Sequence, residues 1–102
     1  MPYIKESEKT PLDTHIDELQ RIIRQWPPDD RDGLVNYAIT TLIDMVYFPL
    51  DSNGEVNITY HKVNSARGVL GCVTDEFYRR RAAPYEDHKM HLNGDVYRAT
   101  KI

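Results

Sequence analysis

Prolines divide this chain into segments, and within each segment apolar residues recur at helical spacing. Pro27 and Pro28 end the first segment, Pro49 ends the second, and Pro84 ends or bends the third. Proline lacks an amide hydrogen and clashes with the preceding helical turn, so a helix rarely continues through it. Between the prolines, apolar side chains repeat every three or four residues, as on one face of an α-helix. The sequence therefore predicts an all-α fold with three main helices.

The first helix is predicted over residues 10–26. Thr10 is a suitable cap and Pro11 suits the first helical position, so residues 1–9 are expected to form a polar arm. One apolar stripe faces inward. It consists of Leu12, Ile16, Leu19, Ile22, Ile23 and Trp26.

The second helix is predicted over about residues 31–47, with Asp29 or Asp30 as its cap. Its apolar residues leave little polar surface, which predicts burial on more than one side, in the core or in an oligomer interface. Residues 51–54, Asp-Ser-Asn-Gly, have the composition of a turn.

Residues 55–60 allow two interpretations. Their alternating apolar and polar side chains are typical of a short strand. They also fit an extended loop that leads into a helix capped by Thr59 or Asn64. The third helix is predicted to begin at Tyr60 or Asn64 and to end at Arg81.

The third helix carries two distinct faces. Its apolar seam has the alternating spacing of a coiled coil and consists of Val63, Ala66, Leu70, Val73 and Phe77. Gly68, Gly71 and Cys72 form a second, small-residue face. An interior glycine costs a helix ~1 kcal/mol relative to alanine. Retaining two of them predicts that another backbone or a ligand approaches this face closely.

A short C-terminal helix is predicted to start at Pro84–Asp87, with proline first and acids in its first turn. Asn93 and Gly94 are expected to end it. Val96 and Tyr97 are expected to be covered by another part of the protein, and residues 98–102 to form a frayed tail.

Composition narrows the class of protein. The 102 residues are expected to form a single helical domain over residues 1–102, with a net charge of −3. This mild acidity argues against binding to duplex DNA. No apolar run is long enough for a signal peptide or a membrane span, so we expect a cytoplasmic protein without membrane contact. The single cysteine, Cys72, excludes an intramolecular disulfide.

The densest chemical cluster lies between residues 76 and 87. Arg79, Arg80 and Arg81 are candidate phosphate contacts, because a guanidinium group donates two parallel hydrogen bonds to such an anion. Tyr78 and Tyr85 lie close enough in sequence to stack on a base. These five residues are the predicted ligand-binding site.

The same arginines have an ordinary structural explanation. Cations stabilise the C-terminal end of a helix through its dipole. Arg79 could also pair with Glu76, and Arg81 with Glu86 or Asp87. Neighbouring arginine and tyrosine residues fit a protein interface equally well, because both residue types are enriched there.

No catalytic signature stands out. His88 and His91 would share one helix face, but the sequence indicates no third metal ligand. The chain has no phosphate-binding loop, dinucleotide fingerprint or nucleophile elbow. We therefore expect a protein that is not an enzyme, with no metal site and no cofactor.

Several short motifs together resemble a family of short uncharacterised proteins found in bacterial, archaeal and phage genomes. These motifs are Met1–Lys5, Asn36–Thr40, Gly68–Cys72, Glu76–Arg80, Ala83–Asp87 and Asn93–Tyr97. Residues 48–62 look longer and less similar to the family. The resemblance carries no established activity, and its distribution implies a phage-encoded regulatory or anti-defence role.

These observations predict an oligomeric binding protein that sequesters a small anionic ligand. The ligand class we expect is a nucleotide signal of prokaryotic antiviral defence, such as a cyclic nucleotide, held by a phage protein. We expect a homo-oligomer, because one small chain would hardly enclose such a ligand. The alternative is a protein–protein interaction module, such as a phage inhibitor or adaptor of a host protein.

Overall fold

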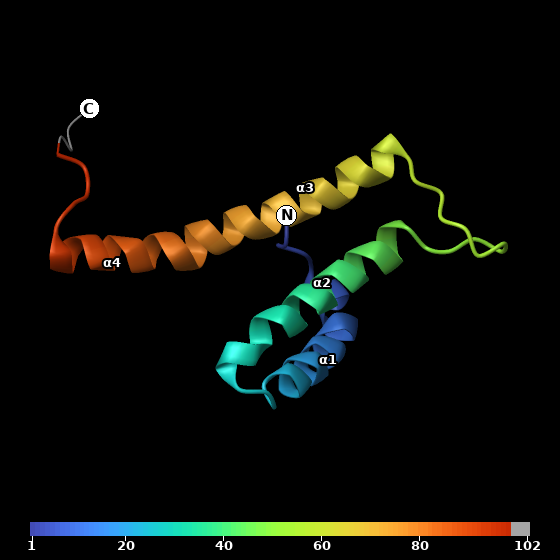
Figure 1. The fold of residues 1–102 in the computed structure, drawn as a ribbon, viewed down its shortest axis with the longest axis horizontal. Coiled ribbons are helices and arrows are strands. Elements are labelled where there is room, and N and C mark those ends of the chain that lie inside the picture. Colours follow the sequence, from blue (N-terminus) through green and yellow to red (C-terminus); the bar gives the residue numbers. More distant parts are fainter. Residues whose placement is uncertain (99–102) are drawn as a thin grey trace. The chain divides into compact units, whose positions relative to one another are not determined.

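The computed structural model describes residues 1–98, which form helices and the segments that connect them (Figure 1). The helices are α1 (Glu6–Ile23), α2 (Arg31–Tyr47), α3 (Tyr60–Phe77) and α4 (Ala83–Asn93). A 3-10 turn, η1 (Pro28–Asp30), precedes α2, and a π-helical turn, η2 (Tyr78–Ala82), joins α3 to α4. The described residues contain no strand, which confirms the predicted all-α fold.

The contacts of the chain fall into two compact units, residues 1–67 and the residues from Gly68 onward. In the first unit, α1 and α2 contact each other and run in opposite directions (Figure 1), as their short connection predicts. The second unit contains the end of α3, η2 and α4. The expected frayed tail of residues 98–102 lies outside the described residues apart from Arg98.

The start predicted for the first helix is wrong. α1 begins at Glu6, so Pro11 lies inside the helix and residues 6–9 are not a polar arm. The Lys5 amide donates to the Glu8 carboxylate at 3.0 Å, and two glutamates lie in the first turn, where the helix dipole favours acids.

One arginine closes the corner between α1 and α2. The Arg31 Nε donates to the Trp26 carbonyl at 2.8 Å, and its Nη2 donates to the Arg24 carbonyl at 3.0 Å. Carbonyls at the end of a helix lack partners within the helix, and a basic side chain can supply them. Arg31 therefore fixes the connection as well as starting α2.

The bounds predicted for the second helix are confirmed, since α2 runs from Arg31 to Tyr47. Its cap differs from the expectation. Asp30 occupies the cap position, but its side chain makes no capping hydrogen bond, and Asp29 lies in the 3-10 turn before the helix.

The turn after α2 is held by bonds within itself. The Asp51 Oδ1 accepts from the amides of Asn53 at 2.8 Å and Glu55 at 2.9 Å. Gly54 adopts a φ of 75°, and an isolated bridge joins Leu50 to Val56. Among the described residues, this bridge is the only β-type backbone pairing.

Residues 55–59 are a loop rather than a strand, Tyr60 begins α3, and Thr59 caps this helix. The Lys62 amide donates to the Thr59 hydroxyl at 3.2 Å, and the Val63 amide donates to the Thr59 carbonyl at 3.0 Å. The interpretation as an extended loop before a capped helix is therefore confirmed, with α3 starting at Tyr60.

The C-terminal helix is observed as α4, but it is not confirmed as a separate helix. Helical backbone continues from α3 through η2 into α4, so Pro84 neither ends nor interrupts it. Gly94, with a φ of 88°, follows the last residue of α4, and its amide donates to the Met90 carbonyl at 2.8 Å. The predicted end at Asn93 and Gly94 is thus confirmed.

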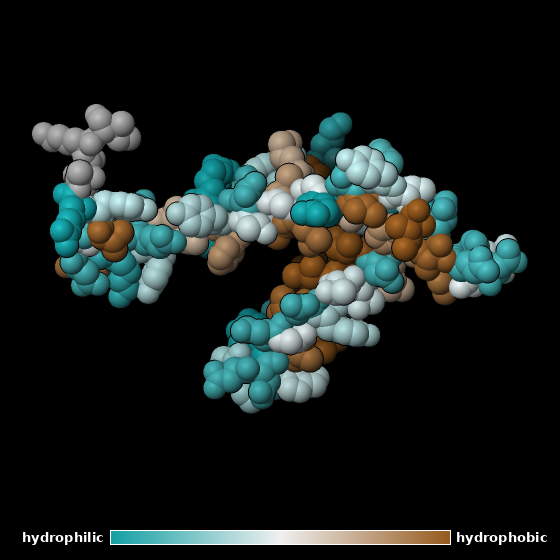
Figure 2. Space-filling model, turned by 45° about the horizontal axis from the view of Figure 1, so that its top comes forward, coloured by the Kyte–Doolittle hydropathy of each residue, from teal (hydrophilic) through white to brown (hydrophobic). Residues whose placement is uncertain are grey.

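Very little of the described chain is enclosed. Ala66, at 6% exposure, is the one buried residue in the described part. No residue of α2 is buried, and Leu42, Met45 and Val46 are each more than half exposed. Figure 2 shows apolar side chains, in brown, reaching the surface along the helices. The burial expected for α2 is therefore not achieved within the single chain.

None of the described helices is both long enough and apolar enough to cross a bilayer.

Candidate functional site

The predicted ligand-binding residues are centred on the π-helical turn η2, which we call the arginine turn (Tyr78–Ala82). In this turn the Ala83 amide donates to the Tyr78 carbonyl, five residues back instead of four. Pro84 explains the change, because it has no amide hydrogen and would clash with the Arg80 carbonyl in a regular α-helix. A wider turn relieves that clash and keeps the helix intact.

Arg79 and Arg81 make local contacts that differ in strength. The Arg79 Nη2 donates to both carboxylate oxygens of Glu76, at 3.0 and 3.1 Å. The Arg81 Nη1 reaches only the backbone carbonyl of Arg80, at 3.4 Å. The pairing of Arg79 with Glu76 is therefore confirmed, while Arg81 pairs with neither of the acids considered for it. The Arg81 guanidinium is the more available of the two for a ligand.

The two tyrosines of the predicted site are both more than half exposed. The Lys89 ammonium lies 5.7 Å from the centre of the Tyr85 ring, which is within the range of a cation–π contact. Lys89 was not among the predicted ligand-binding residues, although its spacing of four residues from Tyr85 was a usable signal. Lys89 adds a fourth cation to the stretch of helix that carries the arginines.

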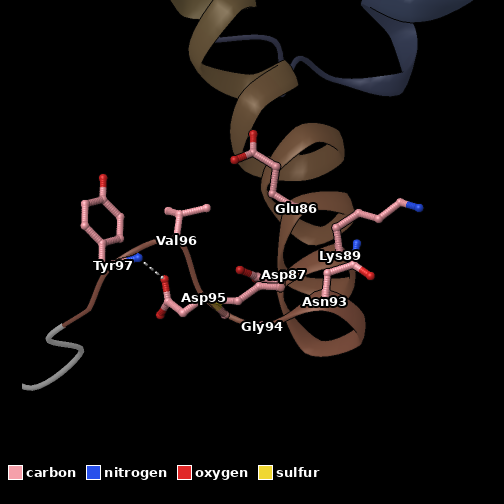
Figure 3. Close-up of a pocket in the computed structure, with 9 residues that line it drawn as sticks. Glu86, Asp87, Lys89, Asn93, Gly94, Asp95, Val96 and Tyr97 are labelled. Carbon is pink, nitrogen blue, oxygen red and sulfur yellow. Dashed lines mark hydrogen bonds between the residues drawn. The ribbon is translucent and has the colours of Figure 1, made fainter.

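A separate hollow lies between α4 and the residues that follow it (Figure 3). Its volume is about 430 Å³. The Glu86 and Asp87 side chains extend from α4 toward this space, and Asp95 and Val96 face it from the other side. The Asp95 carboxylate accepts from the Tyr97 amide at 2.9 Å, which holds the following segment.

The hollow differs from the predicted site in both residues and charge. None of the five predicted residues lines it. Carboxylates dominate its polar lining, and the Lys89 side chain extends away from it in Figure 3, so the hollow disfavours an anion. Val96 and Tyr97 are 87% and 74% exposed, so the expectation that they are covered is wrong for the single chain.

The other candidate groups do not come together. No three His, Cys, Asp or Glu side chains in the described part gather in a way that could hold a metal ion. Cys72 is exposed on the small-residue face. At Gly68 and Gly71, apart from the adjacent residues and the helix's own nearby backbone, no atom of the described residues lies within 4 Å of the position a Cβ would take. The close approach predicted for this face is not found among the described residues.

Comparison with known proteins identifies the family. Neither a curated protein nor a solved structure matches the chain. A family model described as "Domain of unknown function (DUF6899)" matches residues 1–96, which is almost the whole chain. The protein therefore belongs to this family of domains of unknown function.

Proposed function

We propose that the protein is a non-catalytic, oligomeric binding protein that holds a small phosphorylated ligand at the arginine turn. The supporting observation is the π-helical geometry that Pro84 imposes on Tyr78–Ala82. It sets three guanidinium groups and an exposed tyrosine on one turn, with Tyr85 directly after it. π-Helical turns inside α-helices occur frequently at functional sites.

Each side chain has a distinct task in this proposal. Arg81 makes the first phosphate contact, because giving up a 3.4 Å hydrogen bond to a carbonyl costs little. Arg79 stays with Glu76, which orients it and lowers the local repulsion among the arginines. Tyr78 and Tyr85 supply flat apolar surfaces on which a base can stack.

The ligand we propose is a nucleotide, because the cluster combines phosphate-binding and stacking groups. The sequence resemblance described above suggests a setting, namely sequestration of a nucleotide signal of antiviral defence by a phage protein. A ligand pocket normally buries most of its ligand, and an exposed turn on one helix cannot do so. Binding is therefore expected to require an assembly of copies.

Calorimetric titration with a panel of cyclic and linear nucleotides tests the proposal. Arg81→Ala is expected to weaken binding at least about tenfold, because a charge-assisted contact is lost. Arg67→Ala is the matched control, since it removes the same charge from an exposed arginine of the same helix outside the turn. The proposal fails if no nucleotide binds at ~100 μM. It also fails if removal of all three arginines leaves the affinity unchanged.

A protein–protein interaction module remains the second candidate, and the surface of α2 favours it. Leu42, Met45 and Val46 are exposed on one short stretch of α2, and apolar surface of this kind marks interfaces. A single stoichiometric protein partner that is lost in Met45→Asp, together with no binding of nucleotides, would support this function over the first.

A further inference from the structure

Asparagine precedes glycine at two places in the chain, Asn53–Gly54 and Asn93–Gly94. The side-chain amide of an asparagine can react with the backbone nitrogen of the next residue, and glycine hinders this attack least because it has no Cβ. Both asparagines are exposed, and the two glycines have a positive φ of 75° and 88°. The two pairs therefore share the same chemistry, and the structure around them distinguishes one from the other.

The end of α4 restrains Asn93 weakly. Asn93 is the last residue of the helix, so its carbonyl has no donor within the helix. Rotation about the bond from the Asn93 Cα to its carbonyl carbon brings the Gly94 nitrogen toward the side-chain amide. Among the described residues this rotation opens one hydrogen bond, from the Gly94 amide to the Met90 carbonyl at 2.8 Å.

The turn at Asn53 is held more firmly. The same rotation opens three hydrogen bonds there, because Asp51 is linked to residues beyond the rotating bond. The Gly54 amide donates to the Asp51 carbonyl at 3.0 Å, the Glu55 amide to the Asp51 carboxylate at 2.9 Å, and the Asp51 amide to the Glu55 carbonyl at 2.8 Å. Each further hydrogen bond lowers the population of the open form about fivefold. The two additional bonds therefore favour reaction at Asn93.

We infer that Asn93, in the lining of the hollow beside α4 (Figure 3), is the preferred deamidation site of the native chain. The Gly94 nitrogen loses its proton and forms a bond to the Asn93 Cγ, and the bond from Cγ to Nδ2 breaks. The Nδ2 group takes up a proton and leaves as ammonia. Water then opens the cyclic imide at either carbonyl, which gives aspartate or isoaspartate at position 93. No atom is oxidised or reduced.

Deamidation changes the charge of the hollow. Three carboxylates line it already, those of Glu86, Asp87 and Asp95. A fourth carboxylate at position 93 strengthens the negative potential there. It also places a negative charge at the C-terminal end of α4, where the helix dipole disfavours it. The modified chain therefore holds its last helical turn less firmly and attracts cations to the hollow more strongly.

Mass spectrometry of tryptic peptides tests the site after incubation of the full chain at mildly alkaline pH, which promotes loss of the amide proton. Cleavage after Lys89 and Arg98 separates Asn93 from Asn53. Heavy-oxygen water labels each position as its imide opens. In the native chain, conversion at Asn93 is expected to be at least about tenfold faster than at Asn53. Equal rates, or a faster reaction at Asn53, would overturn the inference.

Two controls separate the effect of the fold from that of the dipeptide sequence. In denaturing urea the hydrogen bonds of both segments are lost, so the two asparagines should react at similar rates. A preference for Asn93 that persists in urea would show that the fold is not its cause. Asp51→Ala removes one acceptor from the turn, so it should speed conversion at Asn53 about fivefold and leave Asn93 unchanged. An unchanged rate at Asn53 would contradict the role of these bonds.

Hydrogen exchange tests the consequence for α4. Asn93→Asp introduces the charge of one product, and it should speed exchange of the Gly94 amide about two- to fivefold, the size of an unfavourable charge at a helix end. Asn53→Asp adds the same charge outside the helix and should leave this exchange unchanged. Equal exchange in the two variants would contradict the loosening of the last helical turn.

Discussion

Replacing Gly68 and Gly71 with alanine tests whether anything covers the small-residue face of α3. Both glycines lie in the helix interior, where alanine is favoured by about 1 kcal/mol per position. Apart from the adjacent residues and the helix's own nearby backbone, no described atom lies within 4 Å of either Cβ position, so the added methyl groups meet no obstacle among the described residues. The double variant should therefore be about 2 kcal/mol more stable.

Thermal unfolding followed by circular dichroism measures this gain. For a domain of this size, each kcal/mol raises Tm by about 4–8 °C, so the double variant should gain about 8–16 °C. Gly94→Ala is the matched control, because Gly94 has a φ of 88°, which alanine adopts only with strain. That variant should lose stability.

A different outcome would refute the reasoning. If Gly68→Ala or Gly71→Ala leaves Tm unchanged or lowers it, some other backbone or ligand must contact this face. The melts should be compared at two protein concentrations, because a change confined to the higher one would place that contact between copies of the chain.

Three further predictions concern the π-helical turn before Pro84, the connection between α1 and α2 that Arg31 holds, and the Thr59 cap of α3. Pro84→Ala should restore a regular α-helical turn and stabilise the helix by up to about 3 kcal/mol, as measured by circular dichroism. It should also weaken nucleotide binding, as measured by calorimetry. An unchanged affinity would show that binding does not depend on the π-helical geometry. Arg31→Met should lower the free energy of unfolding by about 1 kcal/mol in urea titrations, because the Arg24 and Trp26 carbonyls, just after α1, lose their donor; an unchanged midpoint would contradict a role for Arg31 in the connection between α1 and α2. Thr59→Ala should cost about 1 kcal/mol in the same titration while Thr59→Ser costs little; equal costs would assign the effect to the lost methyl group.

The bounds of α2 were the best predicted from the sequence, because residues with restricted backbones lie near both of its ends. α2 is bounded by the acidic turn after Pro28 and by Pro49, and both of its predicted ends match. α1 was harder to predict, because Thr10 and Pro11 resemble a helix start more closely than Lys5 does. The bond from the Lys5 amide to the Glu8 side chain moved the start. A propensity pattern does not reveal which of two competing caps will form.

Pro84 illustrates a second limit of sequence patterns. Its lost amide hydrogen was correctly expected to disturb the helix, and the pattern suggested an end or a bend. The backbone instead shifts to hydrogen bonds spanning five residues, so α3 continues into α4. Helix propensities describe what proline costs in a regular α-helical turn. They do not reveal that a shift to hydrogen bonds spanning five residues avoids this cost.

The candidate site was predictable where its members are close in sequence. The tyrosines, the arginines and the bond from Arg79 to Glu76 all follow from neighbouring positions on a helix. The hollow beside Asp95 was harder to predict, because it depends on how the chain turns back after Gly94.

The turn at Asp51 has a consequence for how relatives of this protein can differ. Its hydrogen bonds begin and end within residues 51–55, so neither neighbouring helix depends on it. Residues can be gained or lost there while Pro49 still ends α2 and Thr59 still starts α3. Evolution can vary the length of this segment at little structural cost, and an experimenter can insert a fluorescent label or an affinity tag there.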